Sequence, residues 1–140
     1  MTIAEIKKLE WEDKYSVGVT EIDDQHKRMF VVINELLDAI HTNTPAEHLG
    51  NIIDSLVKYK IFHFATEEKY FKEFNYEETE THIAEHHKFN ERLTALKEKY
   101  PEPTIDFAFE LVDFLEDWLI NHLMTVDQKY VKCFHDHGLK

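Results

Sequence analysis

Seven side chains of metal-binding type are distributed along the chain: His26, His63, Glu67, His82, His86, His122 and Asp127. Two pairs, His63 with Glu67 and His82 with His86, are four residues apart. On a helix this spacing places both side chains on one face, about 6 Å apart at Cβ, so each pair could bind one ion. Cys133 is the only cysteine, which excludes an intrachain disulfide and a zinc site built from thiolates. Any metal would therefore be bound through nitrogen and oxygen.

Burying these seven side chains without a metal would cost free energy. An unpaired buried carboxylate costs several kcal/mol, and an unsatisfied imidazole roughly 1–3 kcal/mol. One such histidine alone would be interpreted as a hydrogen-bonded core residue, and Asp127 alone could be a helix cap, but the complete set favours a metal site. The set exceeds what one ion takes. Two octahedral ions, bridged by Glu67, Asp127 and a shared solvent oxygen, would use all the ligands and leave one coordination position open.

The type of ligand narrows the choice of metal. Imidazole and carboxylate suit iron, manganese or zinc, but tetrahedral zinc would not fill so many positions. An open position on a redox-active pair favours iron, with dioxygen as its ligand. Di-iron sites of the ferritin type use Glu-x-x-His pairs. No Glu stands three residues before any histidine in this chain, which argues against a carboxylate-rich oxidase site.

Helices are the elements that must position these ligands. The 140 residues include only three Gly and three Pro, and turn residues gather at 41–45, 74–79 and 100–104. These breaks leave four long helical stretches, of which the first begins after Thr20 or Asp23 and the others near Thr44, Thr79 and Thr104. The second start carries a capping box with Pro45 at the first helical position. We therefore predict one all-α domain over residues 1–140.

Apolar residues recur every three or four positions in each stretch, and the ligands occupy positions of the same series. The second stretch illustrates the pattern with Leu49, Ile52, Ile53, Leu56, Tyr59, His63, Glu67, Tyr70, Phe71 and Phe74. Asp127 does not fit this series, because it follows His122 by five residues. On an ideal helix this spacing places the two side chains about 140° apart around the helix axis. We expect a bend or a new helix start near Thr125, followed by a short terminal helix. His41, His48, His87, His135 and His137 are expected to be solvated or, for the last two, part of a frayed end.

Residues 1–20 form a leader without a clear period. Trp11, Tyr15, Val17 and Val19 are the apolar residues with which it could cover one end of a bundle.

Four motifs, in this order, resemble the hemerythrins, particularly the single-domain bacterial ones: DDQH (23–26), HFATEE (63–68), HIAEH (82–86) and DWLINHLMTVD (117–127). They extend over nearly the whole chain. The resemblance implies an up-down-up-down four-helix bundle, preceded here by the leader and followed by a short C-terminal helix.

The resemblance also implies how the ligands divide between two iron ions. His82, His86 and His122 correspond to the three histidines of one iron, and His26 and His63 to the two of the other. Glu67 and Asp127 would bridge the irons together with an oxo or hydroxo group. In the family, dioxygen binds at the open position of the two-histidine iron, in an apolar pocket. Trp118 and Leu119 match the family's pocket residues, Met29 and Phe64 are further candidates beside ligands, and all four would equally serve as ordinary core residues.

The main functional expectation is reversible dioxygen binding for storage, delivery or sensing, by a binding protein and not an enzyme. The reason is that five neutral imidazoles and two carboxylates donate less electron density to high-valent iron than a carboxylate-rich site does. One alternative is a di-iron enzyme on the same scaffold, namely a peroxidase, an oxidase or a nitric oxide scavenger. Another is a structural or signalling module in which the metal only holds the bundle together.

The net charge of −12 argues against a nucleic-acid partner, because binding to phosphates requires a cationic surface. The longest apolar run, residues 29–33, is far shorter than the roughly 20 residues of a membrane span. The first residues lack a signal-peptide core. We expect a cytoplasmic protein with no membrane insertion, and the sequence does not indicate protein partners.

Overall fold

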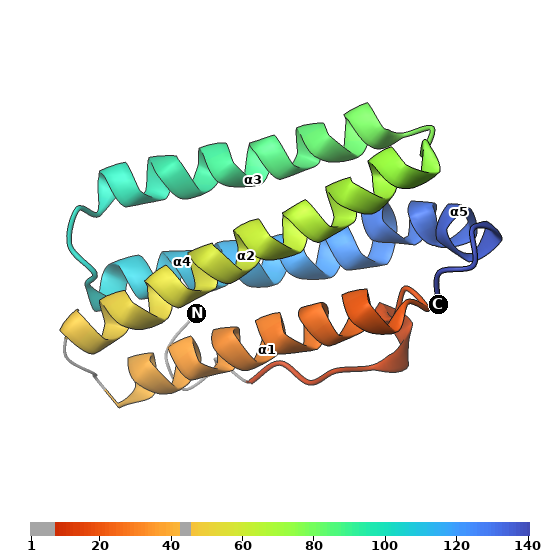
Figure 1. Ribbon diagram of the computed structural model, residues 1–140. Coiled ribbons are helices and arrows are strands. Elements are labelled where there is room, and N and C mark those ends of the chain that lie inside the picture. Colours follow the sequence, from red (N-terminus) through yellow and green to blue (C-terminus); the bar gives the residue numbers. More distant parts are fainter. Residues whose placement is uncertain (1–7, 43–45) are drawn as a thin grey trace.

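A computed structural model of the protein describes residues 8–42 and 46–140. Four long helices follow one another along the chain: α1 (Thr20–His41), α2 (Ala46–Phe74), α3 (Thr79–Lys99) and α4 (Ile105–Asn121). Consecutive helices run in opposite directions, and the described residues include no strand (Figure 1). The prediction of an all-α, up-down-up-down four-helix bundle with a short C-terminal helix is confirmed.

The helices begin close to the residues predicted. α1 starts at Thr20 and α3 at Thr79. Thr104 caps α4, because its side chain accepts a hydrogen bond of 3.2 Å from the backbone N–H three residues later. This bond satisfies one of the donors that a helix start leaves free. The capping box predicted for α2 depends on Thr44 and Pro45, which lie outside the described residues.

The described part of the leader, from residue 8 onward, lies along α1 and does not only cover one end of the bundle (Figure 1). The Leu9 N–H donates to Oδ1 of Asn34 at 2.8 Å, and Nδ2 of Asn34 donates to the Leu9 carbonyl at 3.0 Å. Trp11 and Tyr15 both pack against Phe30 on the side of α1. This part of the leader therefore extends the side of the core.

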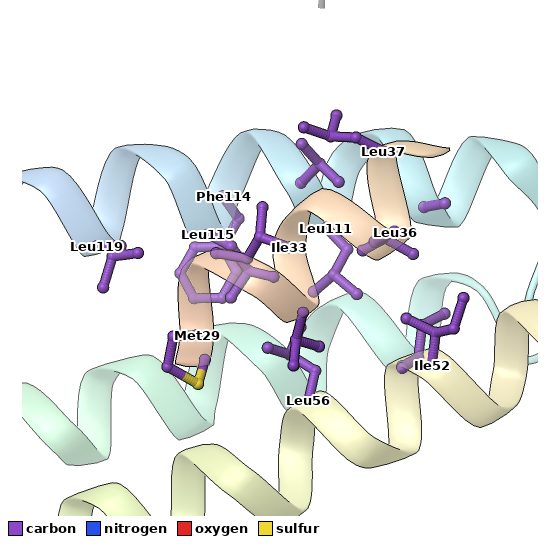
Figure 2. Close-up of a cluster of buried hydrophobic side chains, with 14 of the residues drawn as sticks. Met29, Ile33, Leu36, Leu37, Ile52, Leu56, Leu111, Phe114, Leu115 and Leu119 are labelled. Carbon is purple, nitrogen blue, oxygen red and sulfur yellow. The ribbon is translucent and has the colours of Figure 1, made fainter. Parts of the chain in front are cut away.

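Two apolar cores fill the bundle. In the main core, Met29 and Ile33 of α1 meet Leu56 of α2 and Leu111 and Leu115 of α4 (Figure 2). The end core joins the last leader residues to α2 and to the terminal helix α5 (Val131–Asp136), and its buried members are Val17, Val19, Ile22, Phe71, Tyr76, Tyr130 and Phe134. Along the chain, the predicted metal ligands separate the residues of one core from those of the other. A polar layer thus lies between two apolar regions.

Tyr59 packs against the main core as predicted, but the predicted α2 stripe omits one buried residue. Tyr59 is only half-buried, whereas Lys60 is buried. The step from Leu56 to His63 can be divided as three plus four or as four plus three residues, and the structure uses the second division. Because lysine is charged, the burial of Lys60 was not expected from the sequence.

The histidines outside the predicted site are mostly on the surface, as expected. His41, His48, His87 and His137 are exposed. His135 differs, because it is half-buried and its Nε2 lies 2.9 Å from the carbonyl oxygen of Gly18. Among the described residues, no helix combines the length and the apolar character that crossing a membrane requires.

Candidate metal centre

The seven predicted ligands are buried together inside the bundle, and none is more than 4% exposed. The first three helices and the segment that follows α4 all contribute: His26 comes from α1, His63 and Glu67 from α2, His82 and His86 from α3, and His122 and Asp127 from the segment after α4. The bundle thus brings together residues that are up to a hundred positions apart in the sequence.

Glu67 is the centre of one set of contacts. Its Oε1 lies 3.4 Å from Nε2 of His63, one turn earlier on α2. From α3, Nε2 of His86 lies 3.2 Å and Nε2 of His82 lies 3.7 Å from the same oxygen. The four-residue spacings predicted from the sequence therefore do converge on one point.

Asp127 is brought to the centre by a local change of helix type. α4 continues into a π-helical turn, η3 (His122–Val126), in which the Asp127 N–H donates to the His122 carbonyl five residues before it. This turn aligns residues five apart, and Oδ1 of Asp127 lies 2.9 Å from Nε2 of His122 and 3.3 Å from Nε2 of His82. Oδ2 lies 3.3 Å from Nε2 of His26. The bend expected near Thr125 is thus a π-helical turn.

The donor atoms form two groups that share Glu67. One group joins Glu67 to His82, His86 and His122, and the other joins it to His26, His63 and Asp127; within each group the donor atoms lie within 4.8 Å of one another. With metal–ligand bonds of about 2.1 Å, an octahedral ion separates neighbouring ligands by about 3 Å and opposite ones by about 4.2 Å. The spacing therefore suits one ion in each group.

Many of these buried polar atoms lie close together without forming hydrogen bonds. Within the described parts of the chain, the atoms without a hydrogen-bonding partner include Nε2 of His82 and His122, Oε2 of Glu67 and both carboxylate oxygens of Asp127. The distances between them are short, but the angles are not those of hydrogen bonds. Leaving such atoms unpaired is expensive. A set of donors that point at a common space and not at each other fits a bound metal.

The neighbours of His63 leave its Nε2 free to bind a metal. Nδ1 of His63 lies 2.7 Å from Oε1 of Gln25, which can only accept, so Nδ1 donates its proton. The Gln25 amide is oriented in turn by donating to Oγ1 of Thr66 at 3.1 Å, and Thr66 donates to the Phe62 carbonyl. In a neutral ring the Nε2 lone pair then faces the centre.

His86 has a corresponding outer partner. Its Nδ1 lies 3.3 Å from Oε2 of Glu68, and its Nε2 faces Glu67. A carboxylate that accepts from the outer nitrogen of a ligating histidine raises the basicity of the inner one. Gln25, Thr66 and Glu68 were not predicted from the sequence, although each is adjacent to a predicted ligand.

Burial and neighbouring charges set the protonation states. Burial lowers the pKa of His63 well below its ordinary value, so the ring is neutral at pH 7. Burial acts to raise the pKa of Glu67 and Asp127, but the surrounding imidazoles outweigh it and hold both pKa values well below the usual range. For His82, burial lowers the pKa and the two carboxylates outweigh it, raising the pKa to about 9. The centre thus holds two ionised carboxylates, and a metal would displace the proton of His82.

Two of the four residues proposed for an oxygen pocket stack on predicted ligands. The Trp118 ring stacks on His122 with centroids 4.1 Å apart, and the Phe64 ring stacks on His86 at 3.8 Å. Leu119 and Met29 are buried in the main core, whereas Trp118 is half-buried. The two rings thus cover His86 and His122, which belong to the same donor group, with apolar surface.

Comparison with known proteins identifies the family. A family model described as "Hemerythrin HHE cation binding domain" matches residues 17–134, which include all the clustered donors. The chain belongs to the hemerythrin family. Helix order and the arrangement of the donor residues are consistent with this membership.

Similar hemerythrins occur in several organisms. A bacteriohemerythrin of Methylococcus capsulatus is 32% identical over 120 residues, which cover 86% of this chain and 91% of that protein. A bacteriohemerythrin of Pseudomonas aeruginosa is 33% identical over 123 residues, covering 88% and 79%. A crystal structure of wild-type hemerythrin aligns with a TM-score of 0.79 at 30% identity, over 91% of this chain and 98% of that one.

Proposed function

We propose that the protein binds dioxygen reversibly at a non-haem di-iron centre, for oxygen storage, delivery or sensing. His82, His86 and His122 would hold one iron, His26 and His63 the other, and Glu67 and Asp127 would bridge them with an oxo or hydroxo group. The observation that supports this most directly is the presence of two buried donor groups that share Glu67, in a chain of the hemerythrin family.

The residues of the chain have distinct roles in this proposal. A ferrous pair, when bound, supplies the electrons that reversible dioxygen binding requires. The imidazoles bind as neutral ligands, and Gln25 and Glu68 fix the orientation of His63 and His86. Phe64 and Trp118 cover the centre on one side and, with Leu119 and Met29, exclude water from the bound ligand.

We further propose that the protein is a binder of oxygen and not an enzyme. A site with five imidazoles and two carboxylates donates less electron density to the metal than a carboxylate-rich site, which disfavours cleavage of the O–O bond. The alternative is an oxidase, a peroxidase or a nitric oxide scavenger on the same scaffold, which would turn over its substrate.

Anaerobic reconstitution with ferrous iron tests this proposal. We expect two irons per chain and an absorption band that appears with oxygen and disappears under argon through repeated cycles. With excess reductant, oxygen uptake should stop at one molecule per iron pair. Continued uptake would favour the enzyme, and a loaded protein that is inert to oxygen would favour a structural role for the metal.

The proposal treats residues 1–140 as a single hemerythrin domain in the cytoplasm, with dioxygen as its ligand and without nucleic-acid or membrane partners. The family match over residues 17–134 and the net charge of −12 support the domain and the absence of a nucleic-acid partner. Cell fractionation of the native protein tests the location.

A further inference from the structure

Lys60 is a buried cation beside the metal centre. It lies on α2, one turn before His63, and only 2% of its surface is exposed. Its Nζ lies 4.0 Å from the ring centroid of Trp118, 4.8 Å from that of Phe64 and 5.4 Å from that of Phe89. The ammonium group therefore sits among three aromatic rings inside the bundle.

A lysine at this position costs stability. Removing an ammonium group from water costs several kcal/mol, and contacts with aromatic faces return only part of it. Burial lowers the pKa of Lys60 to about 8, although Glu67 and Asp127 act to raise it. Methionine would fill a similar space without this cost. Packing alone therefore does not explain the presence of a lysine.

The rings that surround the ammonium group also cover the proposed ligands. Trp118 stacks on His122 and Phe64 stacks on His86, with interplanar angles of 16° and 13°. Phe64 and Trp118 are also two of the four residues proposed for the oxygen pocket. The ammonium group of Lys60 thus lies against two of the side chains proposed to line the oxygen pocket.

We infer that Lys60 strengthens ligand binding: its ammonium group donates a hydrogen bond to a ligand bound between it and the metal pair, and so raises the affinity of the pocket for small anions. This inference rests on the proposed di-iron function. Two metal ions would repel the ammonium group, and an anion placed between them is attracted from both sides and removes that repulsion. Dioxygen, which gains negative charge when it binds to a reduced metal pair, would benefit from the same contact.

Azide, a small anion, is a suitable probe for this inference. We would compare the iron-loaded, oxidised parent protein with Lys60→Met and Lys60→Arg, measuring iron per chain and then the azide dissociation constant by optical titration. A hydrogen bond to a charged group corresponds to a change of about tenfold or more in affinity. We expect Lys60→Met to keep two irons and to bind azide at least about tenfold more weakly. Lys60→Arg, which keeps the charge and the donors, should stay within about threefold of the parent.

Lys58→Met is the matched control, because Lys58 is exposed on the same helix and its charge lies outside the pocket. It should bind azide as the parent does. Equal azide affinity in Lys60→Met and the parent would overturn the inference, as would a loss of iron in Lys60→Met, which would make Lys60 a part of the metal site itself. An equal loss of affinity in Lys60→Arg would overturn the role of the charge. If the parent holds no iron, the proposed function fails and the inference fails with it, whereas an iron-loaded parent isolates the role of Lys60.

Discussion

Nε2 of His122 lies 2.9 Å from Oδ1 of Asp127 because a π-helical turn, not an α-helical one, connects the two residues. Inserting an alanine between Thr125 and Val126 would lengthen this connection by one residue and turn Asp127 by about 100° away from the centre. We expect the iron content of the insertion variant to fall at least as far as that of Asp127→Ala, measured by elemental analysis. An insertion variant that keeps both irons would show that this turn does not set the position of Asp127.

Replacing Glu67 should remove metal and stability together. In Glu67→Ala the two metal ions lose a shared negative ligand in a buried site, so we expect at least one iron to be lost and the thermal unfolding midpoint of the loaded protein to fall by about 5 °C or more. Elemental analysis and calorimetry measure the two effects. His87→Ala is the control, because His87 is exposed next to His86 and should be dispensable. If Glu67→Ala keeps both irons and its midpoint, Glu67 is not a bridge.

Leu119 should protect the oxygen-loaded protein from oxidation. Leu119→Asn places a polar group in the proposed pocket, which lets water and protons reach the bound ligand, and we expect oxidation to the diferric state to become about threefold faster or more. The decay of the oxygen-dependent absorption band, followed at one pH, gives the rate. Leu119→Met keeps the position apolar and should decay like the parent. An unchanged rate in an iron-loaded Leu119→Asn variant would disprove this protective role without affecting the di-iron assignment.

Lys60 should give the metal-free protein a specific dependence of stability on pH. The pKa of Lys60 is about 8 in the folded protein against an ordinary 10.5. Below pH 8 the side chain is therefore protonated in both the folded and the unfolded chain. The folded state is then destabilised by the full free-energy cost of burying the ammonium group. That cost is about 3 kcal/mol, and it disappears as the pH rises from 8 to 10.5, because the folded state loses its proton first. The free energy of unfolding of the parent should therefore rise relative to Lys60→Met over this range. Urea unfolding at a series of pH values measures it, and a constant difference would contradict the burial of the ammonium group.

The sequence predicted those parts of the centre that depend on regular helices. His63, Glu67, His82 and His86 could be placed on inward faces because steps of three and four residues define one face of an α-helix. His26 followed from the same reasoning. The order of the helices came from the turns between them and from the family resemblance.

Other features depend on contacts that spacing does not encode. The position of Asp127 requires a π-helical turn, which a count of α-helical residues excludes. The burial of Lys60 depends on three rings from different helices, and a charged residue is normally expected at the surface. The leader was expected at one end of the bundle, but the bonds between Leu9 and Asn34 attach it along α1, and these involve polar groups that carry no periodic signal.

The polar layer between the main core and the end core has a consequence for cooperativity. Without metal, the layer contains two ionised carboxylates and several buried nitrogen and oxygen atoms without hydrogen-bonding partners. The region that joins the two cores therefore contributes little to the stability of the folded state. We expect the end core, with α5, to open while the main core remains intact, so that its amide hydrogens exchange early with solvent. A metal ion held by residues from several helical segments would connect the two cores. We therefore expect metal occupancy to decide whether the protein unfolds as one cooperative unit or as two.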